Sequence, residues 1–351
     1  MQGTLRACGV KAVSACLPQQ TLDLRKYASV AGITDIEKVI KTTGISNVRI
    51  APSDRCTSDY CYEAASAILS TLELSPDCID GLIFVSQTPD YILPASSAVL
   101  HEKLGLSQNC YAIDINQGCC GFIVGLSQAC LLVSSGICKK VLVCVGDTLS
   151  RHLNDRDRSV RTVFGDGGAA ALVEPSASDV TFAIKMDGSR FRDLIIPAGG
   201  ARIPRSDLTK IAKECENGNF RSLEDLYMNG LEIMNFAMRS VKPIIEDVLV
   251  AKNWSKAEVD FFVLHQANKF MLDYLRKKIQ ISEDAMPICL DGIGNTGPAT
   301  IPVLLSAMGN ELRQGKAMQK VVLCGFGVGL TWGAVAINLS DAVFIAPTYI
   351  A

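Results

Sequence analysis

The strongest constraint on how this chain folds is that its second half repeats patterns of its first half. The segment Lys140–Cys144, KVLVC, matches Lys320–Cys324, KVVLC, at a shift of 180 positions. The segment Phe84–Gln87 resembles Val263–Gln266 at a shift of 179. Matches in the same order at nearly the same shift indicate a duplicated unit, in which equivalent turns of the two copies can face each other.

A third match covers a turn and the helix expected after it. Ile113–Gly121 and Ile288–Gly297 each predict an apolar strand, a glycine-bearing turn and a helix start. The pattern breaks at Glu174–Asp179, where Glu-Pro-Ser-Ala-Ser favours a loop. Because 351 residues exceed what one hydrophobic core usually covers, we expect two halves, 1–175 and 176–351.

Short apolar runs alternate with helical patterns, which is typical of an α/β fold. The pattern predicts strands over Leu82–Val85 and Tyr111–Ile115, with helices near Ala95–Leu104 and Gly121–Ser135. Residues 122–133 are apolar nearly all round and are followed by Gly136. Such a segment predicts a buried central helix rather than a surface helix.

Composition excludes several classes of protein. A net charge of −2 provides no global field to hold a nucleic-acid backbone, and no apolar run reaches the roughly 20 residues of a membrane span. The 14 cysteines contain no C-x-x-C pair, so we expect no structural zinc site. Met1–Ala7 has no charged-then-apolar leader, and we therefore expect reduced thiols and a cytoplasmic location.

Cys119 lies where a predicted strand turns into the predicted central helix. Unpaired N–H groups and the positive end of a helix dipole stabilise a thiolate at such a turn, so we expect a lowered pKa. Cysteines are also common in protein cores, and a buried structural thiol is the alternative.

His265 is the histidine that we select as a candidate catalytic residue. It follows the apolar strand Phe261–Leu264, and α/β folds place catalytic groups at the carboxyl ends of strands. A hydrogen-bonded structural histidine is the alternative interpretation. The other two histidines, His101 on a polar helix face and His152 in a charged loop, are expected to be solvated.

Two further segments of the second half carry polar or glycine-rich turns. Asn295 occupies the counterpart of the cysteine turn, where it either caps the next helix or converges with Cys119 and His265. Gly325–Gly333 is glycine-rich after a strand but lacks the βαβ context of a dinucleotide site. Its backbone N–H groups fit an oxyanion hole better.

The segment Phe164–Ala169 has neither the lysine nor the helix start of a phosphate cradle. It therefore indicates tight backbone packing. Four arginines cluster in the preceding loop among aspartates, at Arg151, Arg156, Arg158 and Arg161. We expect a solvated face, with contact to a phosphate as the alternative.

Together these segments resemble the thiolase superfamily, and most closely the β-ketoacyl-acyl carrier protein synthase III family. The resemblance covers nearly the whole chain, and the order of its motifs is specific. The motifs are Thr43-Gly44-Ile45, the cysteine turn, Phe164–Ala169, Met228–Glu232, His265–Asn268, Gly294-Asn295-Thr296 and Gly325–Gly333. The resemblance implies an α/β fold, the thiolase-like five-layered αβαβα sandwich of two duplicated halves.

The resemblance also implies a role for each candidate catalytic residue. Cys119 would take an acyl group from a thioester as the nucleophile, by covalent catalysis. His265 and Asn295 would bind the carbonyl of a malonyl thioester and stabilise the enolate formed when carbon dioxide leaves. The backbone amides of Cys119 and Val328 would form the oxyanion hole, while Cys120 points elsewhere and packs.

The partners implied by the resemblance are an acyl-CoA or acyl-carrier protein, malonyl-acyl carrier protein and a second copy of the chain. Coenzyme A or phosphopantetheine thioesters would be substrates, with no cofactor and no metal. The loop Tyr91–Pro94 matches the one that relatives lend to a partner's acyl tunnel. The implied substrate-binding residues are Lys38, Leu93, Arg158, Asn268 and Lys269.

The chain departs from the family pattern at several positions. Lys38 and Thr42 stand where many members carry a tryptophan and an arginine that sandwich the adenine of coenzyme A. Phe270 replaces a basic residue that helps to dock the carrier protein, and Val328 replaces a glycine of the oxyanion loop. Residues 340–351 run past the usual end of the fold.

Four alternatives remain open at this level. A non-extending acyltransferase or specialised-metabolite synthase would use the same fold. Degradative thiolases carry a histidine where Asn295 stands, and their second cysteine is one place away from Cys324. A papain-type hydrolase would need a different motif around Cys119 and no duplication, and a binding module would leave three convergent polar groups unexplained.

Overall fold

Two mixed β-sheets form the framework of the molecule. The computed structural model covers residues 1–351 and describes every side chain except that of Asn217. The first sheet has the order β17-β2-β8-β7-β5-β6, and β18 also pairs with β2. Its strands are β2 (Cys8–Pro18), β5 (Gly81–Val85), β6 (Tyr111–Ile115), β7 (Val141–Asp147), β8 (Gly167–Pro175), β17 (Val343–Phe344) and β18 (Thr348–Ile350).

The second sheet has the order β1-β9-β16-β15-β14. Its strands are β1 (Gln2–Leu5), β9 (Val180–Met186), β14 (Phe261–Leu264), β15 (Val321–Gly327) and β16 (Thr331–Ile337). The predicted strands over 82–85, 111–115 and 261–264 are present. In each sheet a parallel pair, β5 with β7 or β14 with β15, lies beside an antiparallel neighbour.

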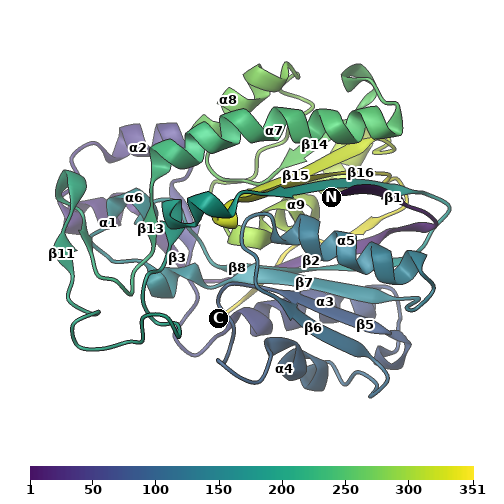
Figure 1. Cartoon of the computed structure of the whole chain (residues 1–351), viewed down its shortest axis with the longest axis horizontal. Helices are drawn as coiled ribbons and strands as arrows, with labels where there is room; N and C mark the ends of the chain where they lie inside the picture. The colour runs from purple at the N-terminus through teal and green to yellow at the C-terminus, as the bar shows by residue number, and fades with distance from the viewer.

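Helices fill three layers around the two sheets, as Figure 1 shows. Helices α3 (Thr57–Thr71) and α4 (Ser96–Lys103) cover the outer face of the first sheet. Helices α5 (Gly121–Ser134) and α9 (Thr300–Gly315) lie between the sheets. Helices α7 (Gly230–Lys252) and α8 (Lys269–Ile279) cover the second sheet. The expected five-layered αβαβα sandwich is confirmed.

The central layer confirms the interpretation of the apolar segment 122–133. Phe122, Ile123 and Leu126 of α5 are fully buried or nearly so and contact residues from both sheets. A helix enclosed on both sides cannot present a polar face without leaving polar groups unpaired. The nearly continuous apolar sequence of α5 follows from that position.

A lobe beside the sandwich carries the remaining elements (Figure 1). It contains the helices α1 (Leu24–Ala31), α2 (Ile36–Thr43) and α6 (Arg158–Arg161). Three two-stranded ribbons join them: β3 (Thr21–Asp23) with β4 (Asn47–Arg49), β10 (Leu194–Ile195) with β13 (Tyr227–Met228), and β11 (Lys213–Glu214) with β12 (Phe220–Arg221). Elsewhere along the chain, short 3-10 helices occur at 76–78, 149–152, 188–193, 216–218, 256–258, 297–299 and 328–330.

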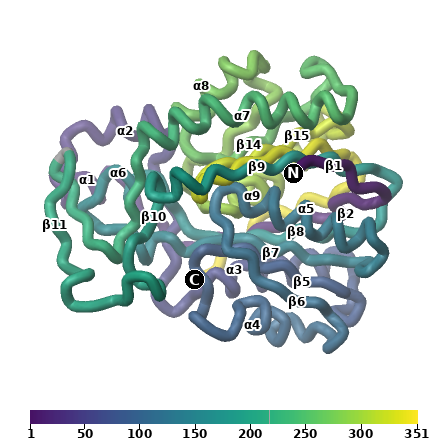
Figure 2. The backbone as a smooth tube through the Cα atoms, in the orientation of Figure 1, coloured from purple at the N-terminus to yellow at the C-terminus, as the bar shows by residue number. Residues whose placement is uncertain are grey.

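The strands near each end of the chain pair with the sheet that is built mainly from the other half of the chain. Strand β1 pairs with β9 of the second sheet, and β17 and β18 pair with β2 of the first. Figure 2 shows the N-terminus beside the second sheet and the C-terminus beside the first. Residues 340–351 therefore extend the first sheet. The division at 175/176 stays a prediction, because both end segments cross it.

The strand expected at the start of Ile288–Gly297 is not formed, and this prediction is wrong. The segment forms a turn, and Asn295 makes an isolated parallel bridge with Phe164 instead. Its backbone bonds run to the other half, from Asn295 N to Val163 O at 2.9 Å and from Gly165 N to Asn295 O at 3.0 Å. These bonds hold the turn at Asn295 against the turn at Phe164 of the first half.

The turn Phe164–Ala169 shows the tight packing that its glycines predict. A Cβ at Gly165 would lie 2.2 Å from the carbonyl oxygen of Ile293, so only glycine fits there. Within the described residues, none of the helices has the length and apolar character needed to cross a membrane.

Candidate active site

Cys119 lies between β6 and α5, where the two halves of the molecule meet. Its side chain is 9% exposed. Burial raises the pKa of the thiol to about 12, while the N–H groups of Val328 and of Cys119 itself lower it. The expected net lowering of the pKa is therefore wrong, because desolvation of the thiolate outweighs these amides.

The glycine-rich segment after β15 packs directly on the sulfur. A Cβ at Gly327 would lie 2.8 Å from the Sγ of Cys119, so a side chain is excluded there. On the opposite side, a Cβ at Gly118 would meet a methyl of Val328 at 2.4 Å. The two glycines let the backbone amides of Cys119 and Val328 approach the same point.

His265 follows β14 and is 2% exposed. Its Nδ1 lies 2.6 Å from the hydroxyl of Thr300, at the start of α9. Burial lowers the pKa of His265 to about 3, so the imidazole is neutral at physiological pH. If Nδ1 accepts from the Thr300 hydroxyl, the ring proton lies on Nε2; if Nδ1 donates to it, the hydroxyl donates to the carbonyl oxygen of Gly297 instead.

Asn295 is 4% exposed and is held by its side-chain oxygen. The N–H of Gly297 donates to its Oδ1 at 3.0 Å. Because this bond fixes the oxygen, the Nδ2 group is the part of the amide that can donate to another molecule. The asparagine therefore combines a local turn contact with an available donor.

Two cavities meet at Cys119. The smaller, of about 80 Å³, is lined by Cys119, His265 and Asn295 together with Asn268 and Phe326. The larger, of about 270 Å³, is lined by Cys119 and Val328 together with other residues of both halves. The structure thus brings the three predicted catalytic residues to one cavity.

Cys120 packs as the resemblance implies. Its side chain is fully buried in the central core, and burial raises the pKa of its thiol well above the ordinary value. All 14 cysteines are free thiols. Among the described residues, no group of three or more His, Cys, Asp or Glu side chains is arranged to hold a metal ion.

Asn268 is the only one of the five implied substrate-binding residues that lines a cavity at Cys119. It also caps α8, because its Oδ1 accepts from the N–H of Met271 at 2.9 Å. The next residue, Lys269, pairs with Asp273 at 2.7 Å on the surface of the same helix. Leu93 is 80% exposed in its loop, away from the cavities.

Arg158 and Lys38 lie at the outer lobe. Arg158 lines a separate surface pocket with Asp35 and Val39. Lys38 is exposed on α2, next to Val39, but does not line this pocket. The structure brings these parts of the chain into one region without bringing Lys38 to the pocket wall.

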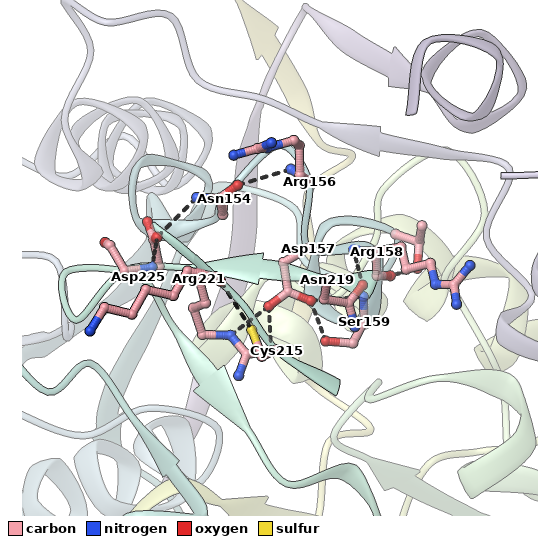
Figure 3. Close-up of polar contacts among 12 residues, drawn as sticks. Asn154, Arg156, Asp157, Arg158, Ser159, Cys215, Asn219, Arg221 and Asp225 are labelled. Atoms are coloured by element: carbon pink, nitrogen blue, oxygen red, sulfur yellow. Dashed lines mark hydrogen bonds and ion pairs between the residues drawn. The ribbon is translucent and has the colours of Figure 1, made fainter. Parts of the chain in front are cut away.

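Of the four clustered arginines, Arg151, Arg156 and Arg158 are exposed, as expected for a solvated face, whereas Arg161 is buried. The loop that carries them is also anchored to the rest of the lobe. Figure 3 shows the loop of Asn154–Ser159 bonded to the ribbon β11–β12. Asp157 is fully buried and pairs with Arg221 at 2.6 Å, and Arg156 stacks over the ring of Phe220 at 3.7 Å. The N–H of Arg158 donates to Asn219 at 3.2 Å.

The two other histidines are half-buried rather than solvated. His101 lies 3.0 Å from the carbonyl oxygen of Ser107. Burial and the charges of Arg205 and Arg151 lower the pKa of His152. Neither histidine lines the two cavities at Cys119.

Sequence reasoning missed three residues near Cys119. Thr300 contacts His265, and Gln87 and Asp147 line the larger cavity. The duplication carried a usable signal for Gln87, because Phe84–Gln87 aligns with the strand end that supplies His265. Asp147 ends β7, next to β5 in the sheet, where the carboxyl ends of parallel strands commonly bind ligands.

A duplicated αβαβα sandwich with cysteine, histidine and asparagine at the junction of its halves defines the class of thiolase-like condensing enzymes. Two family models match the chain. The model of 3-oxoacyl-[acyl-carrier-protein (ACP)] synthase III matches residues 113–188, and the model of its C-terminal part matches residues 249–339.

Curated and solved relatives agree with this class. A β-ketoacyl-[acyl-carrier-protein] synthase III of Lactococcus lactis is 36% identical over 87% of this chain and 91% of its own. One of Caldanaerobacter subterraneus is 32% identical over 95% of this chain and 98% of its own. The solved 3-oxoacyl-(acyl-carrier protein) synthase of Burkholderia xenovorans, 32% identical, superimposes with a TM-score of 0.91 over 100% of this chain and 99% of its own. The chain belongs to the β-ketoacyl-[acyl-carrier-protein] synthase III family of condensing enzymes.

Proposed function

We propose that this protein transfers an acyl group from a thioester to Cys119 and condenses it with a malonyl thioester. The observation that carries the proposal is the placing of Cys119, His265 and Asn295 around one cavity. The chain uses thioesters of coenzyme A or phosphopantetheine as substrates and needs no metal or cofactor for this chemistry.

In the first step the sulfur of Cys119 attacks the thioester carbonyl, and the carrier thiol leaves with the proton. The negative charge that develops on the carbonyl oxygen lies next to the N–H groups of Cys119 and Val328. Amide donors aimed at such an oxygen stabilise the transition state, and removing one typically costs about 10²–10³ in rate. The close packing of Gly327 on the sulfur supports this assignment.

In the second step His265 and Asn295 act on the malonyl thioester. Neutral His265 donates from Nε2 and Asn295 donates from Nδ2 to the thioester oxygen. These bonds stabilise the enolate that forms when the carbon–carbon bond to the carboxylate breaks and carbon dioxide leaves. The enolate carbon then attacks the acyl group, and the thiolate of Cys119 leaves.

The partners of the reaction follow the family. We propose an acyl-CoA or an acyl-carrier protein as acyl donor and malonyl-acyl carrier protein as extender. The surface pocket beside Arg158 supports a role in holding the donor's phosphates. We propose that Lys38 and Lys269 add positive charge that attracts the donor's phosphates, and we assign the protein to the cytoplasm.

We also propose a homodimer. Strand β6 is the edge of the first sheet, and Tyr111 on it is 51% exposed. In the nearby loop Ile92 is 99% and Leu93 is 80% exposed. An unpaired edge beside exposed aliphatic side chains is well suited to pair with a second copy, into which Leu93 would reach.

Mass spectrometry of the intact protein tests the acyl-transfer step. Cys119→Ala is expected to abolish acyl loading, while Cys120→Ala, a neighbouring buried thiol, leaves it largely intact. Loading of the Cys119→Ala protein at the wild-type rate would contradict the assignment of the nucleophile.

Release of labelled carbon dioxide tests the condensation step separately. His265→Ala and Asn295→Ala are expected to load acyl groups but to lose decarboxylation of malonyl thioesters. If wild-type protein loads acyl groups and never releases carbon dioxide, the protein is a non-extending acyltransferase instead.

A further inference from the structure

Three polar side chains line one wall of the larger cavity at Cys119. They are Gln87, Asn116 and Asp147. Gln87 lies two residues after the end of β5, Asn116 directly follows β6, and Asp147 ends β7. Because β7, β5 and β6 are adjacent parallel strands, the three side chains come together at one edge of the sheet.

Most of the other side chains that line this cavity are apolar. They include Leu149, Phe164, Leu194, Ile195, Ile196 and Leu226. His265 and Asn295 do not line this cavity, whereas they do line the smaller one. The larger cavity is therefore the space for the acyl group on Cys119, and the smaller one is where the malonyl thioester reacts.

The carboxyl group of Asp147 is held firmly by one of its two oxygens. Oδ1 accepts from the N–H of Gln87 at 2.7 Å and from the hydroxyls of Ser86 at 3.0 Å and Thr88 at 3.2 Å. These three hydrogen bonds all end on Oδ1, and the backbone N–H of Thr88 also helps to hold the carboxyl. One oxygen is thus fixed in the protein, and the other remains available to a ligand.

Gly297 leaves this second oxygen uncovered. A Cβ at position 297 would lie 2.7 Å from Oδ2 of Asp147, and Gly297 itself is part of the cavity wall. Asp147 is also close enough to Cys119 for its charge to raise the pKa of the thiol. Asp147 and Cys119 both line this cavity, so the carboxyl borders the space that an acyl chain on Cys119 would occupy.

We propose that the acyl group accepted by Cys119 is a short one with a hydroxyl on the second or third carbon, which donates to Oδ2 of Asp147. Gln87 and Asn116 complete the polar wall, and the remaining carbons contact the apolar side chains that line the cavity. This inference rests on the proposed function, because it concerns the acyl group that Cys119 takes up.

The burial of Asp147 supports this substrate class. The side chain is 1% exposed, and burial raises its pKa to about 7 despite the hydrogen bonds to Oδ1. An acyl chain with a methyl group at this point would remove water from Oδ2 without replacing its hydrogen bond. A hydroxyl would replace it, and sites built for a hydroxyl reject analogues that lack one.

Two pairs of acyl groups of nearly equal size test the proposal with the full chain. The pairs are 2-hydroxypropanoyl with 2-methylpropanoyl and 3-hydroxybutanoyl with 3-methylbutanoyl, each as the phosphopantetheine thioester, with acetyl as reference. Mass spectrometry gives the rate of loading onto Cys119, divided by the rate of each thioester with free cysteamine. We expect the hydroxyl member of at least one pair to load roughly tenfold faster or more.

The variant Asp147→Asn tests whether Asp147 is the acceptor. The N–H of Gln87 remains a donor, so it orients the amide oxygen toward itself and turns the NH₂ group toward the cavity. The substrate hydroxyl can then only accept from this NH₂ group, and a bond to a neutral amide is about 1 kcal/mol weaker than a bond to a carboxylate, so the hydroxyl preference should fall about fivefold. Asp166→Asn is the matched control, because Asp166 is also a fully buried carboxyl that accepts from a backbone N–H and a serine hydroxyl, at Ala51 and Ser150.

The outcomes separate this proposal from the proposed function. If wild-type protein loads acetyl but shows less than threefold preference in both pairs, the hydroxyl assignment is overturned and the function stands. A preference that survives Asp147→Asn overturns the role of Asp147. If Cys119 takes no acyl group from any thioester, the proposed function itself fails. Should Asp147→Asn not fold, the wild-type pairs still decide the substrate class.

Discussion

At the level of single residues, the hydroxyl of Thr300 decides which nitrogen of His265 carries the proton. Thr300 Oγ1 lies 2.6 Å from Nδ1 and 3.3 Å from the carbonyl oxygen of Gly297, so it can donate to only one of them. We propose that it donates to Nδ1, the shorter of the two contacts, which leaves the proton on Nε2, where the proposed mechanism needs it. Thr300 is thus a positioning residue for His265.

The variant Thr300→Val is expected to slow decarboxylation about fivefold while acyl loading persists, since a hydrogen bond of this kind contributes about 1 kcal/mol. Thr300→Ser should restore the rate. Thr296→Val is the matched control, because the buried hydroxyl of Thr296 has no partner among the described residues. Equal losses of loading and decarboxylation in Thr300→Val would indicate a merely structural role.

Cys119 provides a second prediction at this scale. Because its pKa is raised to about 12, the thiolate fraction below that pH grows tenfold with each pH unit. Alkylation of Cys119 by iodoacetamide, followed by mass spectrometry, should therefore rise about a hundredfold from pH 7 to pH 9 without a plateau. A plateau below pH 9 would show that the turn stabilises the thiolate more than burial opposes it.

At the level of elements, the buried pair of Asp157 and Arg221 fastens the ribbon β11–β12 to the loop before α6 (Figure 3). Breaking a buried ion pair from one side typically costs about 3 kcal/mol or more. Asp157→Asn is therefore expected to raise amide hydrogen exchange in residues 213–221 about a hundredfold, with β7 and α5 unchanged.

A surface ion pair gives the control for this element. Lys185 and Asp247 pair at 2.6 Å but are 48% and 33% exposed, so Asp247→Asn should change stability by less than about 1 kcal/mol. Unchanged exchange in residues 213–221 of the Asp157→Asn protein would show that other contacts hold the ribbon.

Helix α2 carries a prediction about substrate delivery. Lys38 and Thr42 on this helix cannot stack an adenine, a contact worth about 1–3 kcal/mol or roughly ten- to a hundredfold in affinity. We expect kcat/KM for loading of one acyl chain to be higher from a carrier protein than from coenzyme A. Lys38→Trp should bring the kcat/KM with acyl-CoA closer to that with the acyl-carrier protein. A clear preference of wild-type protein for acyl-CoA would refute the prediction.

Elements with strong local patterns could be predicted from the sequence, and elements held by distant contacts could not. The apolar periodicity of α5, β5 and β6 gave their positions to within a residue or two. The segment before Asn295 looked like a strand, but its backbone pairs with Val163 and Gly165 of the other half. The roles of Asp147 and Thr300 depend on contacts across the fold, which no local pattern reports.

At the scale of the whole molecule, the exposed edge strand β6 predicts self-association. Leu93→Asp should shift the protein from dimer toward monomer in sedimentation velocity at micromolar concentration, because it places a charge in the proposed interface. Leu208→Asp is the matched control, since Leu208 is 79% exposed in a loop of the lobe. A wild-type protein that sediments only as a 37.7 kDa species would contradict the dimer.

The pairing of each end of the chain with the sheet built mainly from the other half has a consequence for how the protein is synthesised. Strand β1 leaves the ribosome first but pairs with β9, and β2 waits for β17 and β18, which emerge after every other described strand. The first sheet therefore keeps the edge at β2 unpaired until all the other described strands have been made. The partly synthesised chain, with its edge at β2 still unpaired, must therefore resist aggregation until that pairing occurs.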